Sequence, residues 1–395
     1  MLTGEARAAI SDLVHAAVSL RPLAEAGEPV RAPIEAAAPA AAGCVSPAEI
    51  VATVADVTGV SLLGPGGGPF DGVVTGRLRD AVSRPALASV PAVDRAAVEA
   101  TARAAGTGTV DVWRAPVDVV TSDGARLRTY AAGRPGAPAV VLASACGMPA
   151  QLCEHWMRFL GRDHHVLTWE TRGLFGDLGT PADFDALGHG VDAQARDLLA
   201  VLDHHGVPTA HVMGLCGGAV VALRAAGLAP HRISALSLWH GDYELGPAVP
   251  KTSHQQNLKA LMAMAARGRT DAAAITTALA GSAMSTVPAD VAHLVVYPYV
   301  TAELFYRYCV LTGAIMAHDV AALLDAVRQP AFVVTSGDDT TAHPAGSHHV
   351  AGALVAGHLT VEPHGDHISV FGANERLTRL MTDLLTRPVP APLTA

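Results

Sequence analysis

From about Val110 onward, short apolar runs alternate with segments whose apolar residues recur every three or four positions. Ala139–Ala143 is apolar throughout, which is typical of a strand buried on both faces. Val191–His205 is amphipathic, as a helix with one buried face would be. The residues on its apolar face are Ala195, Leu198, Leu199 and Leu202. This alternation predicts a mostly parallel sheet with helices on both faces.

The predicted sheet has eight strands, of which the first two form a hairpin around Ser122-Asp123-Gly124. The strands are expected at Val110–Val120, Ala125–Ala131, Ala139–Ala143, Val166–Trp169, Ala210–Leu215, Ile233–Trp239, Ala331–Ser336 and Leu359–Glu362. A helix over Ile368–Leu385 closes the chain. The fold class is therefore α/β.

The first hundred residues lack this alternation and predict a mainly helical extension over residues 1–109. Helices are expected at Ala6–Leu20, from Ser46 to about Thr58, and at Val93–Ala105. A second helical stretch, residues 244–327, interrupts the strands and is expected to be a cap. It includes a predicted helix over Ala272–Ala289. The core would then comprise residues 110–243 and 328–395.

Composition narrows the class of protein. Half of the 395 residues are hydrophobic and 16% are charged, which argues against wholesale disorder. The net charge of −9 argues against a nucleic-acid binder, which normally carries a basic stripe. Ala272–Ala289 is too polar for a membrane span, the N-terminus lacks the pattern of a signal peptide, and the five cysteines form no CxxC pair. These features favour a cytoplasmic protein with reduced thiols. No metal or nucleotide motif is present, so we expect no metal and no bound cofactor.

The strongest chemical signal is His211-Val212-Met213-Gly214-Leu215-Cys216-Gly217-Gly218-Ala219. A predicted strand runs through a G-x-C-x-G turn into a predicted helix. A nucleophile on such a tight turn needs small neighbours, which Gly214 and Gly218 supply. The start of the helix points amides at the sulfur of Cys216 and stabilises a thiolate. The alternative, a structural cysteine on an apolar strand, explains neither the glycines nor the turn.

In this motif and in the turns around it, the chain resembles the α/β-hydrolase superfamily over about residues 110–388. Trp169-Glu170-Thr171-Arg172-Gly173 is similar to the turn after the superfamily's fourth strand. Ser336-Gly337-Asp338-Asp339 and Pro363-His364-Gly365-Asp366-His367 are similar to its acid and histidine turns. The chain order of nucleophile, acid and histidine also matches.

The resemblance implies a catalytic triad of Cys216, His367 and Asp339. His364 is the alternative base, and Asp338 and Asp242 are alternative acids. Asp242 follows the sixth strand and would otherwise bind a substrate amine; it and Leu215 are the expected substrate contacts.

The resemblance also implies an oxyanion hole. Its expected donors are the backbone N–H groups of Gly217 and Met148. The superfamily's common His-Gly pair is absent from the loop after the third strand, where Ala145-Cys146-Gly147-Met148-Pro149 stands instead.

A cysteine at this turn suits transfer better than hydrolysis. An acyl group on Cys216 remains an activated thioester and passes to another thiol, whereas an oxygen ester on serine is less activated. In this respect, in its long extension and in its Gly147-Met148-Pro149 loop, the chain is similar to the stand-alone aminoacyltransferases of syringomycin and coronamic acid assembly lines. That likeness implies transfer of an acyl or aminoacyl group between phosphopantetheine arms of carrier proteins in nonribosomal peptide biosynthesis. A thioesterase or an ester or lactone hydrolase is the alternative, and a non-catalytic binding protein is a third.

Overall fold

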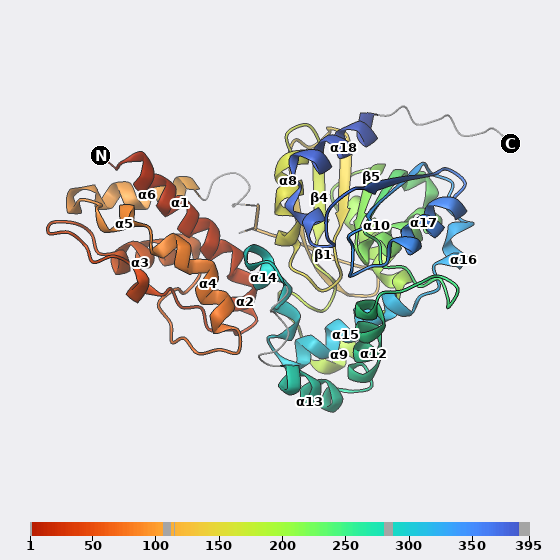
Figure 1. The fold of residues 1–395 in the computed structure, drawn as a ribbon, viewed down its shortest axis with the longest axis horizontal. Coiled ribbons are helices and arrows are strands. Elements are labelled where there is room, and N and C mark those ends of the chain that lie inside the picture. The colour runs from red at the N-terminus through yellow and green to blue at the C-terminus, as the bar shows by residue number, and fades with distance from the viewer. Residues whose placement is uncertain (1, 106–111, 114, 280–286, 387–395) are drawn as a thin grey trace. The chain divides into compact units, whose positions relative to one another are not determined.

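The computed structural model describes residues 2–105, 112–113, 115–279 and 287–386. It forms two compact units (Figure 1). The first comprises Met1–Pro116 and Thr276–Thr301, and the second comprises Val117–Ile275 and Ala302–Ala395. None of the described helices is long and apolar enough to cross a bilayer. The second unit carries the predicted chemistry.

The second unit is built on an eight-stranded sheet of order β1-β2-β4-β3-β5-β6-β7-β8. β1 and β2 form an antiparallel hairpin, β2 pairs antiparallel with β4, and all later pairings are parallel. The strands are β1 (Val117–Val120), β2 (Arg126–Ala132), β3 (Ala139–Ala143), β4 (His165–Trp169), β5 (Ala210–Leu215), β6 (Ile233–Trp239), β7 (Ala331–Ser336) and β8 (Gly357–Glu362). The predicted eight-stranded sheet is confirmed, but its first strand begins at Val117 and not at Val110; residues 112–113 are helical, and residues 110–111 and 114 lie outside the described residues.

The strand order reverses direction between β3 and β5. From β3 the chain crosses to β4 on one side, whereas from β5 it crosses to β6 on the other. In open α/β sheets, ligands bind where the connections diverge in this way, at the carboxyl ends of the strands. The loop after β3 and the turn after β5 therefore meet at the natural position for a site.

Helices pack on both faces of the sheet. Ser237 and Trp239 of β6 point to the same face of the sheet. On that face, Ser237 Oγ contacts Met381 of α18, and the Trp239 ring lies 5.5 Å from the Trp156 ring of α8. α11 packs against α10 and against β5 and β6. The helices around the sheet are α8 (Glu154–Leu160), α9 (Pro181–Asp185), α10 (Val191–His204), α11 (Gly218–Leu228), α16 (Ala321–Leu324), α17 (Pro344–Ala353) and α18 (Glu375–Thr386). Short 3-10 turns occur at Ala150–Cys153, Pro230–Arg232 and Ser369–Gly372.

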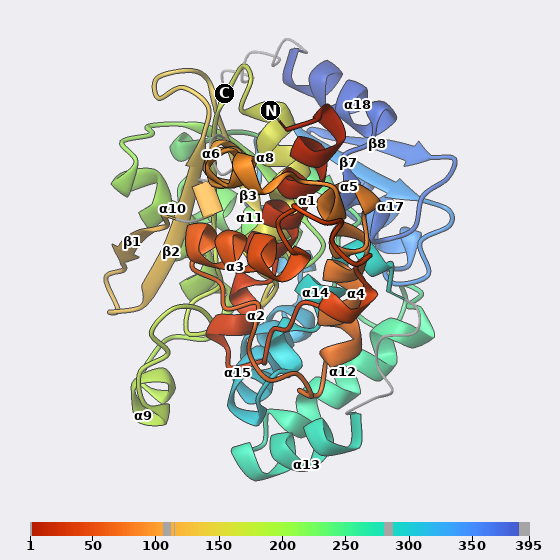
Figure 2. The ribbon, with the colours of Figure 1, turned by 90° about the vertical axis from the view of Figure 1, so that its left-hand side faces the viewer.

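The cap helices of this unit are α12 (Ser253–Ala265), α13 (Arg269–Leu279) and α15 (Ala302–Ala317). α12 packs on α15, and both views show them together (Figures 1 and 2). Arg307 of α15 is buried and donates to the carbonyl oxygens of Gly173 and Leu178 at 3.0 and 2.7 Å. Its guanidinium also lies 4.7 Å from the centre of the Phe184 ring. These contacts fix α15 to the loop that follows β4.

The first unit is helical, as predicted. It contains α1 (Gly4–Ser19), α2 (Arg21–Glu25), α3 (Pro47–Thr58), α4 (Asp71–Val82), α5 (Pro85–Ala88) and α6 (Arg95–Ala105), with 3-10 turns at Ile34–Ala36 and Ala92–Asp94. α1 packs against α3, α4 and α6 (Figure 2). Its apolar positions Ile10, Leu13 and Val14 are fully buried in this packing. The unit therefore has a core of its own.

The division between units differs from the sequence expectation. Residues 276–301 were assigned to the cap, but α14 (Ala289–Val295) packs on α4 and α2 of the first unit, followed by a 3-10 turn at Tyr297–Tyr299. The single helix expected over Ala272–Ala289 is also wrong. α13 covers its start, residues 280–286 lie outside the described residues, and Pro288 is the N-cap at which α14 begins.

Candidate active site

Cys216 occupies the turn between β5 and α11. Its φ of 54° lies in the left-handed region, which a side-chain-bearing residue rarely adopts. The Cys216 amide donates to the Trp239 carbonyl at 3.0 Å, and its own carbonyl accepts from the Ala219 amide at 3.0 Å. The backbone is thus held in a strained turn that leaves the side chain partly exposed.

The flanking glycines are required by contact distances. A Cβ on Gly214 would lie 2.6 Å from the Ala219 Cα, and one on Gly218 would lie 2.0 Å from the Ala143 carbonyl oxygen. Both contacts are with backbone atoms and cannot be relieved by a rotamer change. A Cβ on Gly217 would meet only Ile315 Cγ2, at 3.5 Å. The sequence prediction that Gly214 and Gly218 permit the turn is therefore supported at atomic level.

His367 and Asp339 come together beside this turn. His367 lies in the loop after β8 and Asp339 in the loop after β7. His367 Nδ1 donates to Asp339 Oδ2 at 3.0 Å, and both side chains are buried. The backbone amides of Thr341 and Ala342 donate to Asp339 Oδ1 at 2.9 and 2.8 Å. These amides fix the carboxylate, and the carboxylate fixes the imidazole.

The charges of this group are interdependent. Burial alone would lower the pKa of His367, but the Cys216 charge and the bond to Asp339 raise it well above its usual value. Burial alone would raise the pKa of Asp339, but the bonds from His240 and His367 hold it well below its usual range. His367 Nε2 is buried and makes no hydrogen bond of normal geometry within the described residues. This nitrogen is therefore available to the Cys216 thiol.

The alternative base His364 and the alternative acid Asp338 lie at the surface. His364 and Asp338 face solvent, with 88% and 58% of their side chains exposed, and they contact each other at 3.3 Å. Neither shares the buried network of His367 and Asp339. Of the open alternatives, the geometry thus favours His367 and Asp339.

One member of the network was missed by sequence reasoning. His240, directly after β6, has a φ of 48° and is buried. Its Nδ1 donates to Asp339 Oδ2 at 2.8 Å, so one carboxylate oxygen serves two imidazoles. No sequence signal marks this role, since the His240-Gly241-Asp242 turn drew attention only to its acid. Ligand atoms of His240, Asp339 and His367 lie within 4.8 Å of one another, as in a metal site. The two N–H···O bonds account for that spacing.

The predicted oxyanion donors differ in availability. The amide of Gly217, the N-cap of α11, donates to no acceptor among the described residues. The Met148 amide donates to the Ala145 carbonyl at 3.2 Å, and the Gly147 amide to Thr171 Oγ1 at 2.9 Å. Met148 as second donor would therefore require that turn to open.

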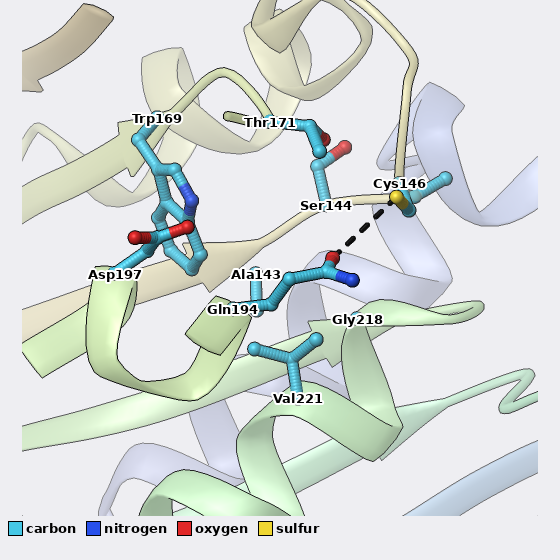
Figure 3. Close-up of a pocket in the computed structure, with 10 residues that line it drawn as sticks. Ala143, Ser144, Cys146, Trp169, Thr171, Gln194, Asp197, Gly218 and Val221 are labelled. Atoms are coloured by element: carbon cyan, nitrogen blue, oxygen red, sulfur yellow. Dashed lines mark hydrogen bonds between the residues drawn. The ribbon is translucent and has the colours of Figure 1, made fainter. Parts of the chain in front are cut away.

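A small cavity lies behind the loop after β3 (Figure 3). It has a volume of about 20 Å³, enough for about one water molecule and too small for a substrate. Cys146 lies at its edge and donates to Gln194 Oε1 at 3.5 Å. Burial raises the pKa of Cys146 to about 11, which leaves it protonated near neutral pH. Cys146 therefore does not compete with Cys216 as a nucleophile.

The two residues expected to contact the substrate, Leu215 and Asp242, differ in their exposure. Leu215 is fully buried at the end of β5, so its side chain offers no surface to a substrate and gives this expectation no support. Asp242 is half-buried, and its Oδ1 accepts from Gln255 Nε2 at 2.6 Å.

α15 covers the site. A Cβ on Gly147 would lie 2.3 Å from Tyr308 Cδ2, and Ile315 packs beside Gly217. Gln194 Nε2 donates to the Leu311 carbonyl at 3.2 Å, which links α15 to α10. The cap helix therefore lies against both the nucleophile turn and the loop after β3.

The turn after β4, which contains Glu170 and Arg172, has a structural role. Arg172 is buried and donates to Asp197 and Asp123 at 2.7 and 2.5 Å, while Glu170 accepts from Arg128 at 2.7 Å. The charges of Glu170 and Arg172 are thus both paired. These pairs stabilise the turn after β4 rather than act on Cys216.

Comparisons with known proteins agree with this architecture. No family model matches the chain. An enol-lactonase structure from Burkholderia xenovorans LB400 superposes with a TM-score of 0.54 at 20% identity, over 69% of this chain and all of that one. The “Putative carbamate hydrolase RutD” of Variovorax paradoxus is 28% identical over 261 residues, which is 64% of this chain and 93% of that protein. Fold, site and similarity together show that the chain belongs to the α/β-hydrolase superfamily.

Within that superfamily, the chain is also similar to a transferase. The L-allo-isoleucyltransferase of Pseudomonas savastanoi pv. glycinea is 25% identical over 177 residues. The match covers 45% of this chain and 62% of that protein. The protein is therefore an enzyme of the α/β-hydrolase type whose sequence is also similar to that of an aminoacyltransferase.

Proposed function

We propose that the protein is an acyltransferase that carries an acyl or aminoacyl group on Cys216 between two thiols. The observation that carries the proposal is the cysteine in the strained turn at the start of α11, beside the buried pair of His367 and Asp339. The turn presents sulfur where most enzymes of this fold present a serine hydroxyl.

The reaction follows from the positions of these groups. His367 Nε2 takes the Cys216 proton, and the thiolate attacks the carbonyl carbon of a substrate thioester. The Gly217 amide stabilises the resulting oxyanion. The intermediate collapses, the C–S bond to the donor thiol breaks, and His367 returns the proton to that thiol. The same steps in reverse transfer the acyl group to an acceptor thiol.

The energetics of a thioester favour transfer of the acyl group from Cys216 over its retention on the enzyme. The bond broken and the bond formed are both thioesters, so each half-reaction is close to isoenergetic. A serine at position 216 would instead hold the group as an oxygen ester, from which return to a thiol is uphill. The thiol of the acceptor also attacks a thioester more readily than water does.

The donors and acceptors are proposed to be carrier proteins bearing phosphopantetheine arms. The similarity to L-allo-isoleucyltransferase supports this part, and it supports a role in natural-product assembly of the nonribosomal peptide kind. The protein itself would then need no cofactor, because the arm belongs to its partner. The proposed location is the cytoplasm, where such carriers act.

Hydrolysis is the second candidate. It is favoured by the similarity to the carbamate hydrolase, which covers most of that protein's length. The same three residues would serve, with water attacking the acyl-enzyme in the second step. The two functions therefore differ in which nucleophile removes the group from Cys216.

Loading experiments on three proteins test the proposal. Wild-type protein is incubated with an aminoacyl carrier protein, and its intact mass is recorded over time. We expect one acyl adduct on wild-type protein and none on Cys216→Ala. Cys216→Ser should acquire the adduct but fail to pass it to a second carrier. Equal adduct formation on Cys216→Ala would overturn the proposal.

A further inference from the structure

Asp242 is an unpaired carboxylate at the edge of the candidate active site. It lies two residues after His240, whose ring binds the same Asp339 oxygen as His367. Its one hydrogen bond comes from the neutral Gln255 amide, and no Lys, Arg or His of the described residues lies within ion-pair distance. Carboxylates that are largely withdrawn from water are normally paired. This exception has to be explained.

The Gln255 side chain is held in one orientation. Its Oε1 accepts from the backbone amides of Thr252 and His343, both at 3.0 Å. Since the oxygen is occupied by two donors, Nε2 must be the atom that faces Asp242. Gln255 is itself buried at the start of α12. The carboxylate is therefore positioned by a fixed, buried partner rather than by a mobile surface loop.

Neighbouring cations do not neutralise Asp242. Lys251 and Lys259 both pair with Glu244 instead. His254 and Lys251 are near enough to lower the pKa of Asp242, as is His367, but burial outweighs them and raises it. A cation arriving in the site would relieve this burial penalty.

We propose that Asp242 binds the α-ammonium group of an aminoacyl thioester, so that the substrates are acyl groups bearing a free amine rather than simple acyl groups. This inference rests on the proposed function, because it places the reacting carbonyl at Cys216. An ammonium group donates to a carboxylate in a charge-assisted hydrogen bond. Asp242 is partly exposed, and it lies near enough to His367 for the charge of that imidazole to act on it.

The test is a competition between matched thioesters. The protein is mixed with equal amounts of alanyl-, valyl- and leucyl-pantetheine and of the corresponding propanoyl, 3-methylbutanoyl and 4-methylpentanoyl thioesters. Intact mass reports which groups load Cys216 and how fast. We expect wild-type protein to prefer the amine-bearing member of at least one pair, and Asp242→Asn to lose that preference by roughly 10- to 100-fold through slower aminoacyl loading.

A second carboxylate provides the control. The Asp338 side chain is exposed and pairs with the exposed His364. Asp338→Asn should therefore keep the wild-type preference. A loss of the preference in this variant as well would attribute the effect to the loss of a negative charge in general and not to Asp242, and would overturn the inference.

The outcomes separate the two proposals. If Asp242→Asn slows both members of a pair equally, the carboxylate acts through His367 and the ammonium site is refuted, while thioester transfer stands. If wild-type protein loads deaminated groups as readily as aminoacyl groups, the ammonium site is again refuted. If none of the six thioesters loads Cys216 of wild-type protein, the proposed function fails, and the inference with it.

Discussion

Replacing Asp339 by Asn tests the assignment of the triad acid. Asn has the same shape and keeps one oxygen for the Thr341 and Ala342 amides. Its NH₂ group then stands where Oδ2 accepted from His367 and His240 at 3.0 and 2.8 Å. Two ring N–H groups would face a donor. His367 must then shift its proton to Nε2, where it can no longer accept the proton of Cys216.

The size of the effect follows from that tautomer. In a Ser-His-Asp triad the same error lowers kcat about 10⁴-fold, or about 5 kcal/mol in the barrier. We expect a loss of this order in the rate of Cys216 loading by an aminoacyl-pantetheine, measured by rapid quench and mass spectrometry. Asp338→Asn is the matched control. Its carboxylate is exposed and contacts only His364, so its rate should stay within about twofold of wild type.

The same two variants can refute the triad assignment. A loss below about tenfold in Asp339→Asn, with the protein folded, would remove Asp339 from the triad. A loss in Asp338→Asn as large as that in Asp339→Asn would also remove it. Circular dichroism and a melting curve for both variants establish that folding is intact.

Three further predictions concern the same site. His240→Ala should slow loading roughly 10- to 100-fold through loss of a hydrogen bond to a charged group, and His240→Asn should restore most of the rate, because its amide replaces Nδ1 and Asn tolerates the left-handed backbone. Gly218→Ala should lower the melting temperature strongly or prevent folding, since its Cβ would lie 2.0 Å from a carbonyl oxygen, whereas Gly217→Ala should melt close to wild type. Burial opposes protonation of His367, but Cys216 and Asp339 raise its pKa, so the folded state holds this proton more tightly than the unfolded chain. The stability advantage of wild type over His367→Gln in urea unfolding should therefore be full below about pH 6.5 and shrink as the pH rises through the raised pKa; an advantage that grows with pH would contradict this.

The fold was predictable where local and global signals agree. Ser46 and Glu49 form a capping box at the start of the helix predicted from Ser46, and Gly59 ends α3 in the left-handed conformation. The strands of the core were visible as apolar runs because parallel strands are buried on both faces. The turn at Cys216 was visible because sterics demand glycine at positions 214 and 218, and those residues are close together in the sequence.

Features that depend on tertiary packing were not predictable. No helix is expected over Asp71–Val82, where Gly72 and Gly76 weaken the helix and no side chain caps its start. It exists because Val74, Leu78 and Val82 are buried in its packing. His240 likewise joins the site only through folding, since 99 residues separate it from Asp339.

The fate of a group held on Cys216, whether it leaves to a thiol or to water, distinguishes a transferase from a hydrolase most directly. Wild-type protein is loaded with an aminoacyl group, freed of excess substrate, and divided between buffer and buffer containing a carrier protein with an unloaded pantetheine arm. We expect a long-lived adduct in buffer alone and rapid appearance of the same group on the carrier. Loss of the adduct at one rate in both samples, with free amino acid as the product, would contradict transfer.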